Sequence, residues 1–217
     1  MKIEINVPER LDEITLEQYQ KFEKLNTEEN KDSAFLLQKM VQIFCGLDLK
    51  DVANIKYKSV QEITMHLNKI FDTKHKLKPT FILNNIEYGF IPVLDEMTLG
   101  EYIDLDENLG NWETMHKAMA VLYRPITFKN KSKYIIEKYK GKENWNQMKA
   151  MPLDVVFGAM VFFWSLSNEL LTITLNYLQS ENLTTQQQEH LERSGVGINQ
   201  YTTLVKEMLP SLIRLPV

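Results

Sequence analysis

Apolar residues recur through most of this chain at the three- and four-residue spacing of amphipathic helices. One example is the stretch that Ser33 can cap, where Leu36, Met40 and Phe44 recur at helical spacing and Gly46 provides a stop. The same reasoning predicts helices at residues 16–25, 34–45, 49–55, 60–71, 99–109, 112–123 and 152–179, a short helix around Trp145, and two more at 185–193 and 198–209.

Strand signals are fewer and shorter. Residues 1–7 alternate apolar and polar side chains, which predicts a half-buried strand. A hairpin is predicted at 81–88, where Asn84 and Asn85 tolerate the left-handed backbone of a tight turn. A second, basic hairpin is predicted as an insertion at about residues 125–140. The fold class is therefore mainly α with small β elements (α+β).

A nine-residue motif occurs twice, from Leu11 and again from Leu94, at an offset of 83 residues. In each copy a threonine, Thr15 or Thr98, can cap a helix, and a Gln or Glu three residues later can complete a capping box. A third box is predicted at Ser59, with Glu62 as its partner. These signals predict local structure and do not indicate any chemical activity.

The repeated motif suggests a tandem duplication of a strand–helix–helix–helix unit. The predicted organisation is a first unit at residues 1–78, a second at 79–182 that contains the basic hairpin, and a tail at 183–217. The tail holds two helices and an apolar arm, Leu209–Val217, which is expected to dock on the body or on a neighbouring molecule.

The longest predicted helix places Pro152 at its first position, and Gly158 leaves room for a close approach of another backbone segment. Its most apolar run, Val155–Trp164, is 10 residues long, whereas a membrane-spanning helix needs about 20. The chain starts without the pattern of a signal peptide, and Cys45 is its only cysteine. We therefore expect a soluble, intracellular product without a membrane partner.

Composition and motifs favour no enzyme class. The 217 residues carry a net charge of −4, which gives no overall attraction to nucleic acid. Phosphate-binding loops, nucleotide fingerprints, nucleophile elbows and zinc motifs are missing. The four histidines are scattered along the sequence, without the spacing that a metal site requires. We predict a non-enzymatic protein with no catalytic residue, no metal and no cofactor.

Two charged stretches are the remaining candidates for function. Acidic residues cluster between Asp95 and Glu107, and basic residues cluster from Arg124 to Lys142. Each stretch can be a solvated face, and the basic one can touch nucleic-acid phosphates. Opposite charges on one molecule also suit head-to-tail self-association. The predicted subunit interface comprises Glu101, Asp104, Asp106, Glu107, Lys129, Lys131, Lys133, Lys138, Lys140, Leu212, Ile213 and Leu215.

Two segments, Met97–Asp106 and Asn111–Pro125, resemble structural-region proteins of tailed bacteriophages, and are most similar to those of crAss-like phages of gut Bacteroidetes. Residues 14–22 and 151–156 fit the same resemblance, which extends over about residues 11–165. No catalytic residue is attached to these segments.

The resemblance implies a virion structural protein, made in the host bacterial cytoplasm and located at the tail or portal vertex. As a head–tail connector it would form a homo-oligomeric ring, twelve-fold in related short-tailed phages, between portal and tail. Its expected partners are further copies of itself, the portal and other tail or ring proteins, with a weak contact to packaged DNA. The alternative is a tail assembly chaperone that binds a tail protein before assembly.

Overall fold

The computed structural model describes residues 5–31, 33–131 and 133–180, with side chains described as far as Glu169. Its first half is helical, and cap chemistry explains where the helix at Ala34–Phe44 begins and ends. The Ser33 hydroxyl accepts a hydrogen bond from Leu36 N (3.1 Å), and Gly46 follows the helix with a φ of +64°. The elements are a 3₁₀ helix at Leu11–Glu13, α1 at Leu16–Glu23, α2 at Ala34–Phe44, α3 at Leu49–Ala53 and α4 at Tyr57–Phe71.

The second half adds a small antiparallel sheet to further helices, so the α+β prediction is confirmed. Asn84 and Asn85 have φ angles of 51° and 62° and form the predicted turn between β1 and β2. The elements are β1 at Thr80–Leu83, β2 at Ile86–Phe90, α5 at Leu99–Asn108, α6 at Met115–Leu122, β3 at Tyr123–Asn130, β4 at Lys133–Ile136 and α7 at Leu153–Ser180, with 3₁₀ helices at Leu94–Glu96, Gly141–Asn144 and Asn146–Ala150.

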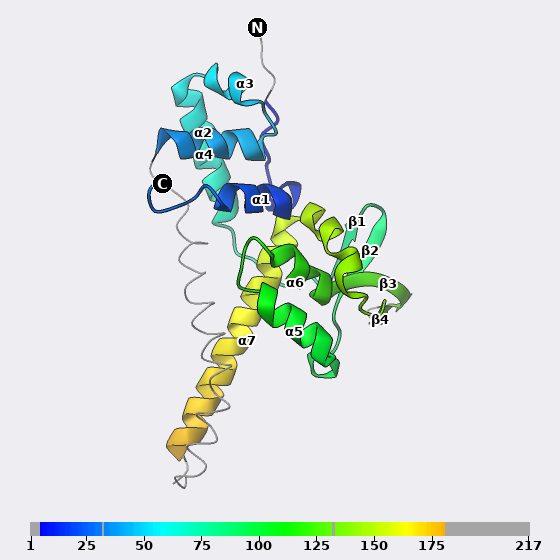
Figure 1. The fold of residues 1–217 in the computed structure, drawn as a ribbon. Coiled ribbons are helices and arrows are strands. Elements are labelled where there is room, and N and C mark those ends of the chain that lie inside the picture. Colours follow the sequence, from blue (N-terminus) through cyan, green and yellow to red (C-terminus); the bar gives the residue numbers. More distant parts are fainter. Residues whose placement is uncertain (1–4, 32, 132, 181–217) are drawn as a thin grey trace.

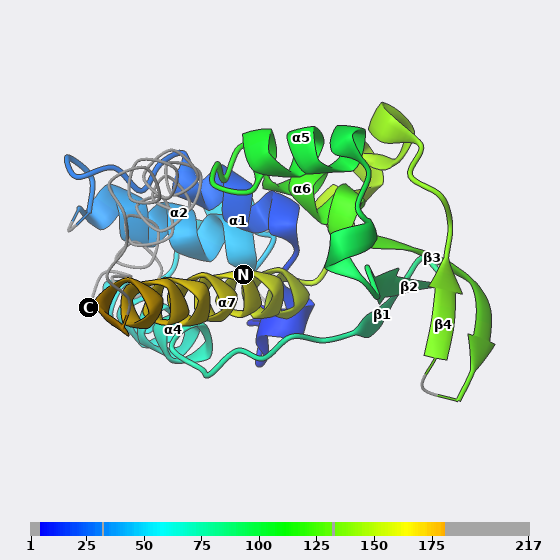
Figure 2. The same ribbon diagram turned by 90° about the horizontal axis from the view of Figure 1, so that it is seen from below.

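The four strands follow the order β1-β2-β3-β4, and each neighbouring pair is antiparallel. The predicted basic hairpin is β3–β4. Its strand β3 also pairs with β2, through Phe90 opposite Tyr123 and Gly89 opposite Arg124. The hairpin therefore grows out of the sheet that the first hairpin begins, and its free end points away from the helices (Figure 2). That the hairpin is an insertion into a repeated unit stays a prediction.

Helix α7 begins in the middle of the molecule, where the other described elements meet (Figure 1). Helices α1, α2 and α4 lie at its N-terminal end, α5 and α6 lie beside it, and its C-terminal part extends away from the other described elements. Aromatic rings fill the core: the Tyr19 ring centroid lies 4.6 Å from that of Trp112 and 5.3 Å from that of Phe157. Side chains from residues 11–71 and from residues 81–163 thus share one core.

The nine-residue motif has the same local structure in both copies. Each begins with a 3₁₀ helix, and Thr15 and Thr98 each form a capping box with Gln18 and Glu101 respectively. The surroundings of the copies differ. Leu16 is fully buried and its amide donates to Met151 O (2.9 Å), whereas the equivalent Leu99 is 74% exposed. The prediction that the two units arose by duplication stays a prediction.

Several local predictions are wrong. Residues 5–7, the described part of the strand predicted at 1–7, form no strand; the side chains of Ile5 and Val7 pack beside a small cluster around Val41. Ser59 lies inside α4, because that helix begins at Tyr57 with Lys56 as its cap. The helix predicted at 112–123 is shorter in the structure, where α6 begins at Met115 and ends at Leu122. The last predicted residue, Tyr123, is the first residue of β3.

Other predictions fit closely. Pro152 precedes the first residue of α7 rather than occupying it, a difference of one position. Gly158 has the expected close backbone neighbour, the Lys76 carbonyl. The tail helices and the apolar arm, with Leu212, Ile213 and Leu215, lie outside the described residues.

Candidate functional site

Helix α5 presents a surface that is both apolar and acidic. Its capping box fixes the start of the helix, since Thr98 N donates to Glu101 Oε2 (2.7 Å) and Glu101 N donates to Thr98 Oγ1 (3.3 Å). The helix contains no basic residue. We call its exposed side the α5 face, which consists of Leu99, Tyr102, Ile103, Asp106 and Glu107.

Two predicted interface residues on α5 are used inside the molecule. Glu101 is 5% exposed, and its carboxylate lies 2.6 Å from Arg124 Nη1 on β3. Asp104 is half-buried and accepts a hydrogen bond from Tyr139 Oη at 2.7 Å. These contacts attach α5 to the sheet and to the segment after β4. Only Asp106 and Glu107 of the four predicted acids stay exposed.

The Glu101 carboxylate is held in its charged form. Burial raises the pKa of Glu101, but the hydrogen bonds from Thr98 and the charge and hydrogen bond of Arg124 together outweigh burial and bring the pKa below its ordinary value of 4.5. A buried acid and base that are paired in this way form a structural link between α5 and β3, so neither charge is available to a partner molecule.

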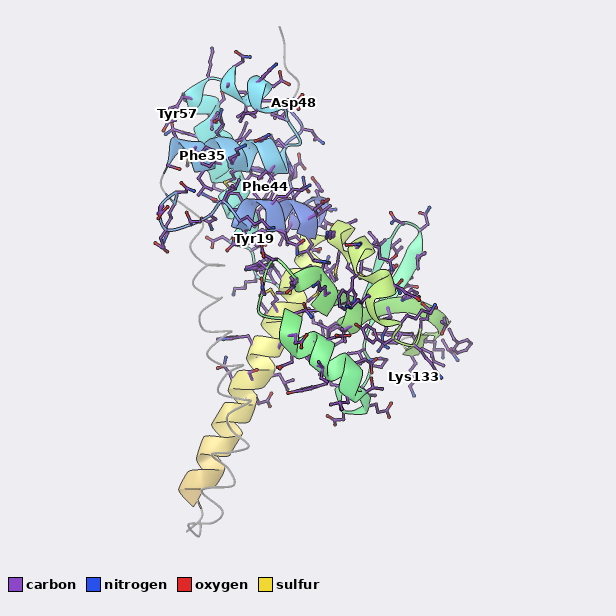
Figure 3. All side chains as sticks on the ribbon, viewed as in Figure 1. Tyr19, Phe35, Phe44, Asp48, Tyr57 and Lys133 are labelled. Atoms are coloured by element: carbon purple, nitrogen blue, oxygen red, sulfur yellow. The ribbon has the colours of Figure 1, made fainter. Side chains whose placement is uncertain are left out.

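The β3–β4 hairpin presents a surface that is apolar and basic. Phe128 and Ile135 face each other across the two strands, and each is 59% exposed. Lys131, Lys133 and Lys138 are exposed and form no ion pair within the described residues. We call these five residues the hairpin surface. Figure 3 places Lys133 at the outer side of the molecule, far from the core around Tyr19.

The other two predicted lysines are already paired. Lys129 forms an ion pair with Glu87 on β2, and Lys140 forms one with Glu137. Both pairs are partly exposed, so each contributes little to stability. The Lys129 pair does add a cross-strand contact that holds β3 against β2.

A close contact attaches β4 of the hairpin to β2. Tyr134 on β4 crosses over Gly89 on β2, where a Cβ atom would come within 2.5 Å of the tyrosine ring. The Tyr134 hydroxyl donates to Phe90 O (2.8 Å) and lies 3.2 Å from Pro79 O. Because Tyr134 lies one residue from the turn end of β4, this contact gives the exposed end of the hairpin a defined direction.

Sequence reasoning found the charges of both surfaces and missed their apolar parts. On the hairpin, a strand register that starts at the turn after Asn130 would have placed Phe128 opposite Ile135, on the same face. On α5, Leu99 and Tyr102 are three residues apart and share a helix face. Their 74% and 55% exposure could not be predicted, because the equivalent residues of the first motif copy are buried.

Two groups with shifted pKa values, His116 and Glu23, lie away from the α5 face and the hairpin surface. Burial, with help from Lys149 and Lys117, lowers the pKa of His116 to about 4, and its neutral Nδ1 lies 3.1 Å from Gln20 Nε2. The same Gln20 amide donates to Trp112 O (2.6 Å), so these contacts hold α1 against the start of α6. Beside them a hollow of about 660 Å³ is lined in part by Glu23, whose carboxyl pKa burial raises.

Within the described residues, no group of three or more His, Cys, Asp and Glu side chains is placed to hold a metal ion. The helices of that part of the chain also lack a segment that is both long and apolar enough to cross a membrane. Comparisons with protein-family models, with curated proteins and with solved structures found no match to this chain.

Proposed function

We propose that this protein is a non-enzymatic structural component of a tailed-phage virion, a subunit of an oligomeric ring that joins portal and tail. In this ring the α5 face of one subunit meets the hairpin surface of the next. The observation that carries the proposal is the pairing of two exposed surfaces on different elements, opposite in charge and each with uncovered apolar side chains.

Such surfaces suit a head-to-tail contact. A ring requires a heterologous interface, in which one patch meets a different patch on the next copy. Leu99, Tyr102 and Ile103 can bury Phe128 and Ile135 of a neighbour, and burial of apolar area supplies most of the association energy. Opposite charges around them favour the correct register over an acid-to-acid or base-to-base contact.

The resemblance of residues 97–106 and 111–125 to structural-region proteins of tailed phages supports the virion assignment. In this proposal the ring is twelve-fold, its other partners are the portal and neighbouring tail proteins, and the basic tip of the hairpin contacts packaged DNA weakly. The protein acts by contact and turns over no substrate.

Charge reversal tests the interface. Lys133→Glu and Glu107→Lys each place like charges across the contact, and each is expected to raise the concentration needed for assembly by about tenfold per interface. An equal mixture of the two variants should assemble again, because alternating subunits then meet with opposite charges at every interface. The double variant in one chain should assemble as well. Sedimentation velocity measures all four samples.

Lys50→Glu on α3 is the matched control, since Lys50 is exposed and lies on neither surface. It changes net charge as Lys133→Glu does and should leave assembly unchanged. Failure of both the mixture and the double variant to assemble would sink the proposed contact. Mass spectrometry of purified particles then separates the virion component from an assembly chaperone, which would be missing from mature particles.

A further inference from the structure

A second hollow lies where the N-terminal segment, the end of α4, the linker after α4 and the start of α7 meet. Its volume is about 740 Å³, within the range of roughly 300–1,000 Å³ that is usual for small-ligand sites. It is lined by Glu9, Arg10, Leu11, Asp12, His66, Lys69, Ile70, Thr73, Lys74, His75, Lys76, Leu77, Lys78 and Asp154. Five of these side chains are permanently cationic and three are carboxylates.

The charges around this hollow do not cancel. Arg10 pairs with Asp12 at 2.8 Å, and Lys78 pairs with Asp154. Lys69, Lys74 and Lys76 have no ion pair within the described residues, and Glu9 is the only lining carboxylate in that part of the chain without one. The surplus is positive although the whole chain carries −4, so basic residues are concentrated at this place.

The linker that carries these lysines is held in a fixed path. Along residues 74–78 the lysines are exposed, and the alternate residues, His75 and Leu77, are half-buried. The His75 ring packs against Phe157 of α7 with the centroids 4.9 Å apart. The backbone of Lys76 lies against Gly158, and Tyr123 Oη donates to Lys78 O at 2.8 Å. Alternate lysines therefore point the same way from an anchored strand-like segment.

We propose that this hollow binds an oligophosphate group through Lys69, Lys74 and Lys76. Each ammonium group offers three donors, and phosphate groups offer several acceptor oxygens with a high charge density. Two or three phosphates match three unpaired lysines in charge. The backbone of residues 74–78 is already held in place, so it loses little conformational entropy when a ligand binds. Only the lysine side chains have to become ordered. The bound phosphates come either from a free compound or from a nucleic-acid backbone.

This site is independent of the proposed ring contact, since its residues lie neither on the α5 face nor on the hairpin surface. The full-length protein is titrated with inorganic tripolyphosphate by calorimetry, and with a short DNA duplex by fluorescence anisotropy, at low salt. The triple variant Lys69→Gln/Lys74→Gln/Lys76→Gln is expected to weaken binding about tenfold or more. Tripolyphosphate binding identifies a free oligophosphate as sufficient, and duplex binding alone identifies the backbone as the source.

The control is Lys50→Gln/Lys56→Gln/Lys58→Gln, which removes the same charge from exposed positions near the other end of α4. It should bind both probes within about twofold of the unaltered protein, because screened charges so distant contribute little. Equal weakening by the two triple variants would show non-specific attraction and overturn the proposal. The proposal would also be overturned if the unaltered protein bound neither tripolyphosphate nor the duplex. Neither result bears on oligomer assembly.

Discussion

Replacing Arg124 by methionine is expected to destabilise the protein by about 3–5 kcal/mol, because it leaves the Glu101 carboxylate buried without its counter-charge. Arg124 and Glu101 are 8% and 5% exposed, and their side chains are 2.6 Å apart. Methionine keeps a long apolar stem, so loss of charge rather than loss of volume dominates. Chemical denaturation at neutral pH measures the change in the free energy of unfolding.

The pH dependence of this loss follows from the direction of the Glu101 shift. Its folded-state pKa lies below the ordinary value of 4.5, so the ionised carboxylate contributes stability above that pH and loses it as pH falls through the folded-state pKa. The penalty of Arg124→Met should therefore shrink as the pH falls from 4.5 towards the folded-state pKa of Glu101, because the intact pair loses its contribution over that range. Adding Glu101→Gln should recover part of the loss at neutral pH.

A cost below about 1 kcal/mol for Arg124→Met would contradict the buried pair, since that is the worth of an exposed salt bridge. The control is Lys24→Met. Lys24 pairs with Glu113 at 2.8 Å, but both side chains are more than half exposed. This substitution also removes one surface ion pair and should change stability by less than about 1 kcal/mol.

Gly158→Ala is expected to destabilise the fold by about 2–3 kcal/mol, although alanine is the better helix former. An added Cβ would lie 2.3 Å from the Lys76 carbonyl oxygen and 2.9 Å from its carbonyl carbon. Both neighbours are backbone, so relief requires α7 or the linker to move. Thermal and chemical denaturation measure the loss.

Gly100→Ala provides a matched control within the same protein. Gly100 also lies in a helix, but nothing is within 4 Å of an added Cβ there. That substitution should stabilise the protein by up to about 0.5–1 kcal/mol through helix propensity and a less flexible unfolded chain. Similar effects at both glycines would show that the close approach at Gly158 can relax without cost.

Much of the fold could be predicted because its signals are local. The capping residues Thr15, Ser33 and Thr98 each start a helix, since a side-chain hydroxyl meets an amide three residues away. Asn84 and Asn85 supply the left-handed turn of the first hairpin. These interactions need no knowledge of the rest of the chain.

Two predictions that rested on local sequence patterns are wrong. Ser59 could begin a helix, but α4 starts two residues earlier, at Tyr57, so Ser59 falls within the helix instead of capping it. Residues 5–7 alternate apolar and polar side chains as a strand does, yet no strand of the described sheet pairs with them. Without a partner for its backbone hydrogen bonds, the segment does not form a strand.

The same distinction between local and non-local information applies to the predicted subunit interface. Sequence identified acids and bases, whereas the fold determined which of them are available. Glu101 pairs with Arg124 and Asp104 accepts from Tyr139, while Asp106 and Glu107 stay in solvent. Spacing of charged residues carries no information about a partner that arrives from 20 or more positions away.

By itself, then, the sequence determined the short-range geometry: the two capping boxes, the turn at Asn84–Asn85 and the extent of α7. Only the tertiary structure decided which surfaces are exposed. Leu16 and Leu99 occupy the same place in one repeated motif, yet one is fully buried and the other is 74% exposed. A helix cap or a tight turn depends on neighbours along the chain, but the burial of a side chain depends on what packs against it, and that is set by segments distant in sequence.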